Sequence, residues 1–125
     1  IGTMVEDALI IRTLPNSESK MTTDYSGSNP AYLETSACSF LRDVGIKHLL
    51  LDLPSVDREE DEGELAGHKA FWNQPGTADL ERTITELVYV GDHIHDGLYL
   101  LDIQIAPFAN DASPSRPILY SLNER

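Results

Sequence analysis

The stretch KHLLLDLPSVD, residues 47–57, decides the fold that we expect of this chain. Its run of leucines, bounded by polar residues, is typical of a buried strand. Pro54 cannot donate to a sheet ladder, so the strand must end near Asp52. We therefore predict a strand over residues 47–52 whose exit offers Asp52, Ser55 and Asp57 to a site. The same side chains would also suit a turn in which they accept hydrogen bonds from backbone N–H groups.

Segments of helix and strand character surround this stretch in an order typical of an α/β protein. A strand at residues 8–11 is followed by a helix that begins at Thr35 or Ser36, runs to about Asp43 and ends at Gly45. The order strand, helix, strand predicts an α/β unit. Further along we expect a short helix over 65–72, strands over 83–90, 98–106 and 117–122, and loops over 14–30, 58–64, 73–76, 91–97 and 107–114.

Composition bounds the classes of protein to which the chain can belong. With 125 residues, 41% of them hydrophobic, we expect one domain, residues 1–125, with a buried core. Nine basic residues against 21 acidic ones give a net charge of −12, which argues against nucleic acid or an anionic membrane as a partner. No apolar run approaches the roughly 20 residues of a membrane span, so we expect a cytoplasmic protein.

Cys38 is the one cysteine, so no disulfide can form within the chain. It lies in a predicted helix, where a free cysteine usually behaves as a small buried apolar side chain. No basic neighbour in the sequence would activate its thiol, so a nucleophilic role is not favoured.

His68 and Glu86 are candidate site residues with unremarkable surroundings. His68 lies among apolar and aromatic residues, where a histidine is more often simply packed, and a ligand role needs partners elsewhere. Glu86 shares its strand face with Ile84 and Val88 if alternate residues point the same way. A carboxylate on a buried apolar face needs an ion-pair partner or a metal, unless that face is exposed on an edge strand.

His93 and His95 form the local pattern most typical of a metal site, because His-x-His can place two imidazoles on one face of a strand. Gly91 and Gly97 flank the pair, so a solvated turn is the alternative interpretation. If the pair is a separate metal site, this chain should bind metal by itself. The sequence contains no glycine-rich phosphate loop, no G-x-S-x-G elbow and no HExxH pair.

Residues 52–57, DLPSVD, resemble the D-x-P-S-x-D segment of the cyclase family of metal-dependent hydrolases, which includes kynurenine formamidase-like and isatin hydrolase-like enzymes. Other pieces agree with that family in their order along nearly the whole chain, and this shared order makes the resemblance specific. They are the strand ending in Arg12 and Thr13, NPAYL at 29–33, His68 after the acidic loop, ITEL at 84–87, and NDASPSRP at 110–117.

The resemblance implies a swivelling β/β/α domain with a mixed sheet, present here as its C-terminal part. It also implies a divalent metal, zinc or manganese, with zinc favoured. The family's main ligand motif, H-x-G-T-H-x-D-x-P, lies upstream of the first strand in that family and is not in this sequence, so we expect a truncated chain. His68 and Glu86 match the family's later ligands. The gap between them is longer than in the bacterial formamidases, with the extra residues around 73–81.

The activity implied is hydrolysis of an arylformamide, amide or lactam by metal-activated water, as in tryptophan catabolism. His68 would bind the metal or move a proton, while Asp52, Ser55 and Asp57 would orient the ligands. The expected partners are a small-molecule substrate, the N-terminal half of the same protein and further copies of it, and this chain alone would be inactive. The alternative is a non-catalytic cyclase-like domain without the upstream metal-binding motif.

Overall fold

The computed structural model describes residues 6–122, so the predicted start of a truncated chain at Ile1 and the polar C-terminal end lie outside the described residues. The chain divides into two compact units, Ile1–Gly91 and Asp92–Arg125. Each unit has its own sheet. The single domain expected for residues 1–125 stays a prediction.

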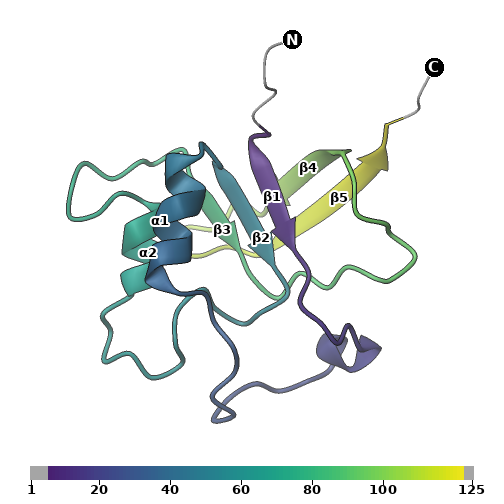
Figure 1. Ribbon diagram of the computed structural model, residues 1–125, viewed down its shortest axis with the longest axis horizontal. Helices are drawn as coiled ribbons and strands as arrows, with labels where there is room; N and C mark the ends of the chain where they lie inside the picture. The colour runs from purple at the N-terminus through teal and green to yellow at the C-terminus, as the bar shows by residue number, and fades with distance from the viewer. Residues whose placement is uncertain (1–5, 123–125) are drawn as a thin grey trace. The chain divides into compact units, whose positions relative to one another are not determined.

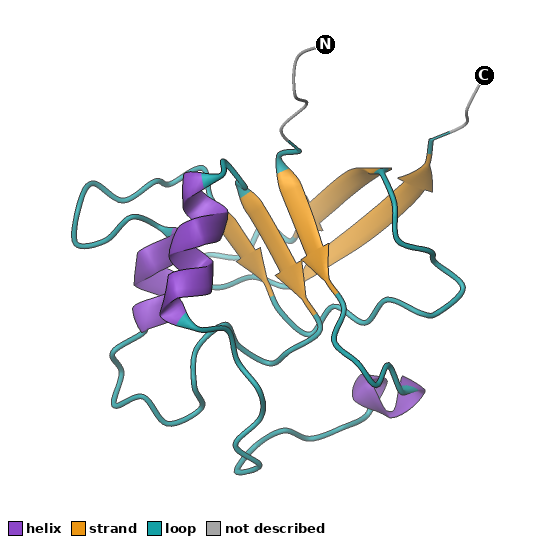
Figure 2. Cartoon of the chain, in the orientation of Figure 1, coloured by secondary structure: helices purple, strands orange, loops and turns teal. Residues whose placement is uncertain are grey.

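The first unit is an α/β structure built on three parallel strands in the order β1-β2-β3 (Figure 1). The register pairs Ala8 with His48 and His48 with Thr83. Parallel neighbours require crossover connections, and a helix lies in each of the two crossovers here (Figure 2). The bounds are β1 (Ala8–Ile11), α1 (Thr35–Asp43), β2 (His48–Leu51), α2 (Ala66–Phe71) and β3 (Thr83–Thr85).

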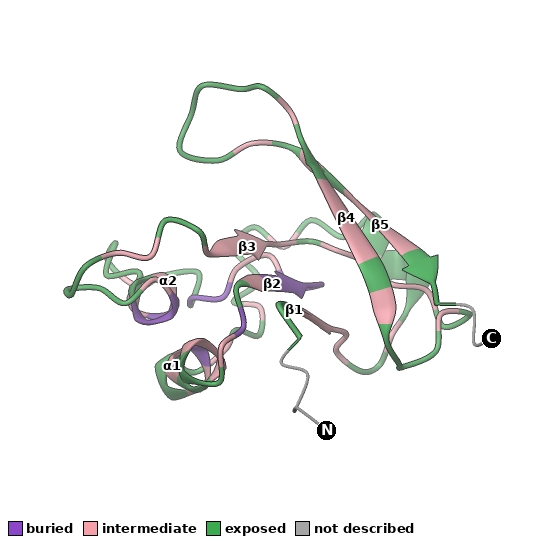
Figure 3. Ribbon diagram, turned by 90° about the horizontal axis from the view of Figure 1, so that it is seen from above, coloured by how far each residue is buried: buried purple, intermediate pink, exposed green. Residues whose placement is uncertain are grey.

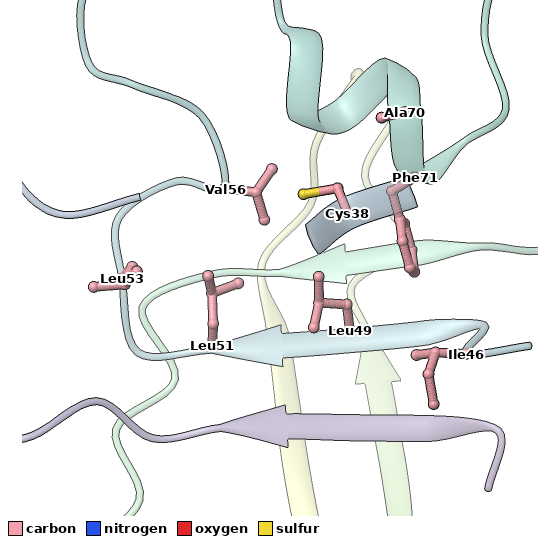
Figure 4. Packing of buried hydrophobic residues seen from close by; sticks show 8 residues of the cluster. All are labelled: Cys38, Ile46, Leu49, Leu51, Leu53, Val56, Ala70 and Phe71. Carbon is pink, nitrogen blue, oxygen red and sulfur yellow. The ribbon is translucent and has the colours of Figure 1, made fainter. Parts of the chain in front are cut away.

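The core of this unit lies between the sheet and its two helices (Figure 4). Leu49 and Leu51 of β2 are fully buried in one cluster with Cys38 of α1 and Phe71 of α2. Leu50 points to the other face of the strand and is also 0% exposed. The leucine run is uninterrupted because successive side chains point to opposite faces and Leu49, Leu50 and Leu51 are all buried; Figure 3 colours this part of β2 as buried.

The second unit is an antiparallel hairpin of β4 (Tyr99–Ile105) and β5 (Ser115–Ser121). Pro117 lies opposite Ile103 in a strand with one partner, which is where a sheet tolerates proline. The predicted α/β class is thus confirmed in its coarse form. The strands form one parallel and one antiparallel sheet rather than a single mixed sheet, because β4 and β5 pair only with each other in the described chain.

Several element bounds differ from the prediction. The expected strand 83–90 ends at Thr85, because Leu87 adopts a left-handed backbone with φ of 57°. The N-cap of α1 is Glu34, without a side-chain cap. The loop 14–30 contains a short 3-10 helix, η1 (Glu18–Met21). Among residues 6–122, no helix is long and apolar enough to cross a bilayer.

Candidate functional site

The candidate site lies where the three parallel strands end. All three arrowheads point to the same edge of the sheet (Figure 2), and α/β proteins commonly place their sites at such an edge. β1 leads to Thr13, β2 to Asp52 and β3 to Glu86. The loop after β2 then carries Asp57, and α2 carries His68.

Asp57 holds both the start of α2 and the ring of His68. Its Oδ1 accepts a hydrogen bond from the N–H of Gly67, and its Oδ2 accepts the N–H of His68 at 3.2 Å. The same Oδ2 lies 2.6 Å from His68 Nδ1. The N-cap residue Leu65 makes no side-chain cap, so a carboxylate from the preceding loop serves the first amides of the helix. One side chain therefore caps α2 and orients its histidine.

Gly67 makes this close approach sterically feasible. A Cβ at this position would lie 2.7 Å from Asp57 Oδ1 and 3.3 Å from the Sγ of Cys38. A glycine inside a helix normally weakens it, yet α2 forms at Ala66–Phe71, within the predicted residues 65–72. The structure gives the reason for the glycine: any larger residue would push the carboxylate away from the amides it accepts.

Asp57 is held in its charged form. Burial raises the pKa of Asp57, but the hydrogen bonds from the His68 ring and the amides of Gly67 and His68 outweigh this, and the net pKa is lowered. An ionised carboxylate can only accept, so the proton in the 2.6 Å contact belongs on His68 Nδ1. In the neutral ring, a proton on Nδ1 would leave the lone pair of Nε2 for a cation, which is the arrangement in which carboxylates support metal-binding histidines.

Glu86 faces the free nitrogen of that ring. Its Oε1 accepts the N–H of Val56 at 3.1 Å and lies 3.5 Å from His68 Nε2. Burial is the largest cause that raises the pKa of Glu86, and the charge of Asp57 adds to it; the hydrogen bond from the Val56 amide is the largest effect in the other direction, and the net pKa is raised. A cation beside this carboxylate would favour its charged form.

The spacing of this pair fits a metal ion. Two ligands of a tetrahedral zinc, each at about 2.0–2.2 Å, lie about 3.3–3.6 Å apart. The 3.5 Å between His68 Nε2 and Glu86 Oε1 falls in that range. An imidazole with a carboxylate is a donor set that suits zinc and, with more oxygen ligands, manganese. Within residues 6–122, no three or more His, Cys, Asp or Glu side chains gather where they could hold a metal ion together.

Asp52 has partners of its own. Its carboxylate accepts the N–H of Thr13 at 2.9 Å and the Thr13 hydroxyl at 3.0 Å, and it forms an ion pair with Lys20 at 2.8 Å. The Lys20 ammonium also donates to the backbone oxygen of Thr13 and to the side chain of Asn16. Asp52 thus fastens the loop after β1, whereas Asp57 and Ser55 contact the two candidate ligands.

The other candidate residues make none of the hydrogen bonds described above for Asp57, His68 and Glu86. His93 and His95 are exposed in the turn before β4, and the backbone oxygen of His95 accepts the Tyr99 hydroxyl. Burial, and secondarily the charge of Asp57, raises the pKa of Cys38 to about 11, so its thiol stays protonated at neutral pH. This agrees with the expectation that Cys38 is not a nucleophile.

Sequence reasoning missed two residues of this region. The ring of Trp72 lies 5.3 Å from that of His68, one helical turn away, and the i, i+4 spacing was a usable signal. Lys20 reaches Asp52 across 32 positions of sequence, and nothing in the loop that carries it pointed to that pairing.

No protein-family model matches this chain, and no curated protein matches it in sequence. The likeness to the cyclase family therefore rests on the ordered motifs from Thr13 to residues 110–117. The geometry at Asp57, His68 and Glu86 is independent of that likeness.

Proposed function

We propose that this chain supplies two ligands, His68 Nε2 and Glu86, to a divalent metal in a hydrolase that cleaves a carbon–nitrogen bond. The observation that carries this proposal is the continuous line of contacts from Asp57 through the His68 ring to Glu86. A packed structural histidine needs only satisfied ring nitrogens. Here one nitrogen is supported by a carboxylate and the other faces a second carboxylate at ligand spacing.

Each residue of the line has a distinct task in the proposed site. Asp57 accepts the Nδ1 proton and holds the ring of His68 in one orientation. The Val56 amide and the Ser55 hydroxyl hold the carboxylate of Glu86. A divalent metal bound there would polarise a substrate carbonyl and lower the pKa of a water molecule. Glu86 and His68 would hold the metal at the edge of the sheet, and Asp57 would keep the His68 ring in the orientation that directs Nε2 toward it.

The substrate class that we propose is an arylformamide, amide or lactam, and the metal is zinc. Both follow from the resemblance to cyclase-family hydrolases, as does a swivelling β/β/α domain of which this chain is the C-terminal part. The remaining ligands would come from the N-terminal half of the protein. A cytoplasmic location and assembly of several copies belong to the same proposal.

Zinc binding by the protein expressed from the complete reading frame tests the proposal. Trp72 is the single tryptophan of these residues and lies beside His68, so its fluorescence should change as zinc binds; in a longer protein the Trp72→Phe variant isolates its signal. We expect His68→Ala and Glu86→Gln each to weaken zinc binding by well over tenfold, because loss of an outer-shell partner alone costs about 10- to 100-fold and these two residues are the proposed ligands. Leu80→Ala, at a side chain 92% exposed, is the matched control.

The same titration distinguishes the proposed metal-dependent hydrolase from the alternative, a non-catalytic domain that keeps the fold. Zinc affinity that is equal in the unmodified protein and both ligand variants would exclude the site. Zinc bound by residues 1–125 alone and lost on replacing His93 or His95 would favour the separate His-x-His site. Hydrolysis of formanilide that depends on zinc and on Glu86 would establish the enzyme.

A further inference from the structure

One extra residue interrupts the pairing of the chain after β3 with β2. At the start of β3, the N–H of Thr83 donates to the backbone oxygen of Lys47 at 2.9 Å. In a regular parallel ladder, the N–H of Leu87 would donate to Leu51, four residues further along each strand. The N–H that reaches the Leu51 oxygen, at 2.9 Å, is instead that of Val88. The chain therefore forms a β-bulge, with one residue inserted between β3 and Val88.

Leu87 is the inserted residue, as its backbone and its exposure indicate. Its φ of 57° lies in the left-handed region, which crowds the Cβ of a leucine. Its side chain is 61% exposed, whereas Glu86 and Val88 on either side of it are half-buried. Its N–H donates to the backbone oxygen of Leu53 at 2.9 Å, beyond the end of β2. Leu87 therefore acts through its backbone, and its side chain contributes little to the core.

The bulge ties Glu86 to the loop that follows β2. Leu87 contacts this loop through its N–H, and Glu86 contacts it through Oε1, which accepts the N–H of Val56 at 3.1 Å. The same Oε1 lies 3.5 Å from Nε2 of His68. Bulges are frequent next to active sites, where they change the direction of a side chain. This one begins at a residue whose carboxylate faces the candidate histidine.

We propose that residue 87 is a positioning residue, and that the bulge it forms fixes the backbone of Glu86 so that its carboxylate meets a metal beside His68. This inference rests on the proposed function, because it assigns the bulge to a metal ligand. A left-handed leucine is unfavourable, and such strain persists only where neighbouring contacts determine the conformation. The contacts with the loop after β2 do so here, and they orient Glu86 before a metal binds.

The experiment separates the inserted residue from its side chain. The protein expressed from the complete reading frame is compared with Leu87→Gly and with a variant from which Leu87 is deleted. Deletion of Leu80, which is 92% exposed in the loop before β3, is the matched control. Zinc affinity is measured by calorimetry, and stability is measured by urea unfolding.

We expect Leu87→Gly to keep the bulge, because glycine adopts the left-handed backbone without crowding. Its urea midpoint should rise by about 0.5 M, and its zinc affinity should stay within about twofold. Deletion of Leu87 puts Val88 at the position from which a regular ladder donates to Leu51. This variant should fold but bind zinc about tenfold more weakly or worse, the size of loss seen when the support of a ligand is removed. Deletion of Leu80 should change neither quantity.

A loss of zinc affinity in the Leu87 deletion but not in Leu87→Gly, with both variants folded, supports positioning, because a purely structural residue would change affinity only through stability. If the deletion variant does not fold, Leu87→Val decides, since a β-branched residue resists the left-handed backbone and should weaken zinc binding. Unchanged zinc affinity in the folded deletion variant, or in Leu87→Val where the deletion fails to fold, would overturn the role of the bulge and leave the proposed ligands in place. Equal losses in Leu87→Gly and in the deletion would also overturn it. Absence of zinc binding by the unmodified protein would overturn the proposed function and this inference together.

Discussion

Gly67 is a position where helix propensity and steric fit predict opposite results for one substitution. Alanine is about 1 kcal/mol more favourable than glycine inside a helix, so propensity alone predicts that Gly67→Ala stabilises the protein. The added Cβ would lie 2.7 Å from Asp57 Oδ1, closer than such contacts allow. Either the carboxylate or the start of α2 must move, and the amide hydrogen bonds from Gly67 and His68 to Asp57 are then lost or lengthened.

The magnitudes decide which effect prevails. A hydrogen bond to a charged group contributes about 1.5–3 kcal/mol, and two such bonds are at risk. After the gain in helix propensity, we expect Gly67→Ala to lower the free energy of unfolding by about 2–5 kcal/mol. With a urea m-value of about 1–3 kcal/mol/M, the unfolding midpoint should fall by about 1 M or more.

Urea unfolding followed by the fluorescence of Trp72 measures this change, because Trp72 directly follows α2. Lys69→Ala is the control: it lies exposed on the same helix and reports propensity without the steric contact. If Gly67→Ala is as stable as the unmodified protein or more stable, then Asp57 does not approach the helix as closely as the structure has it. The steric reasoning would then be refuted, and with it the positioning of His68.

Three further results are expected. Lys20→Met should destabilise the protein by about 3 kcal/mol in thermal unfolding, because it leaves the buried Asp52 carboxylate without its cation, and adding Asp52→Asn should recover most of the loss; equal loss in the double variant would refute the pairing. Cys38 should resist a thiol reagent at pH 8 until urea unfolds the chain. Because the pKa of its thiol is raised to about 11, the contribution of Cys38 to stability is present below the ordinary pKa of 9.0 and is lost as pH rises toward 11. Asp57 has a lowered pKa, so its contribution is present above the ordinary value of 3.8 and is lost as pH falls through the folded pKa, and Asp57→Asn should flatten the acid limb of a stability-against-pH curve.

The sequence predicted those parts of the fold that depend on local periodicity. The leucine run of residues 47–52 indicated β2, and its burial on both faces explains why the pattern was so clear. Two-residue alternation placed Ile84 and Glu86 on one face, and Ile84 packs against the core beneath the helices while Glu86 reaches His68 of α2. Both signals are local, so a single sequence carries them.

The parts of the structure that were not predicted depend on loops, and the hydrophobic periodicity of the sequence does not determine the path of a loop. The backbone turn at Leu87 ended a strand that β-branched composition would have continued to residue 90. Asp52 and Asp57 looked equivalent in the sequence, five positions apart on one loop. Their different roles follow from Thr13 and Lys20 in one case and from Gly67 and His68 in the other, which only the folded chain brings to them.

Because Asp57 contacts both the first amides of α2 and the ring of His68, the stability of this helix is linked to whether a cation is bound at His68. A six-residue helix is marginal by itself, so α2 depends on the carboxylate that accepts its first amides. Any cation that binds Nε2 favours the conformers in which that carboxylate also holds the ring, and so suppresses local opening of the helix. The amide protons of Gly67 and His68 should therefore exchange with solvent more slowly when the cation is bound. Their exchange rates would report how much of the protein has a cation bound at His68 Nε2.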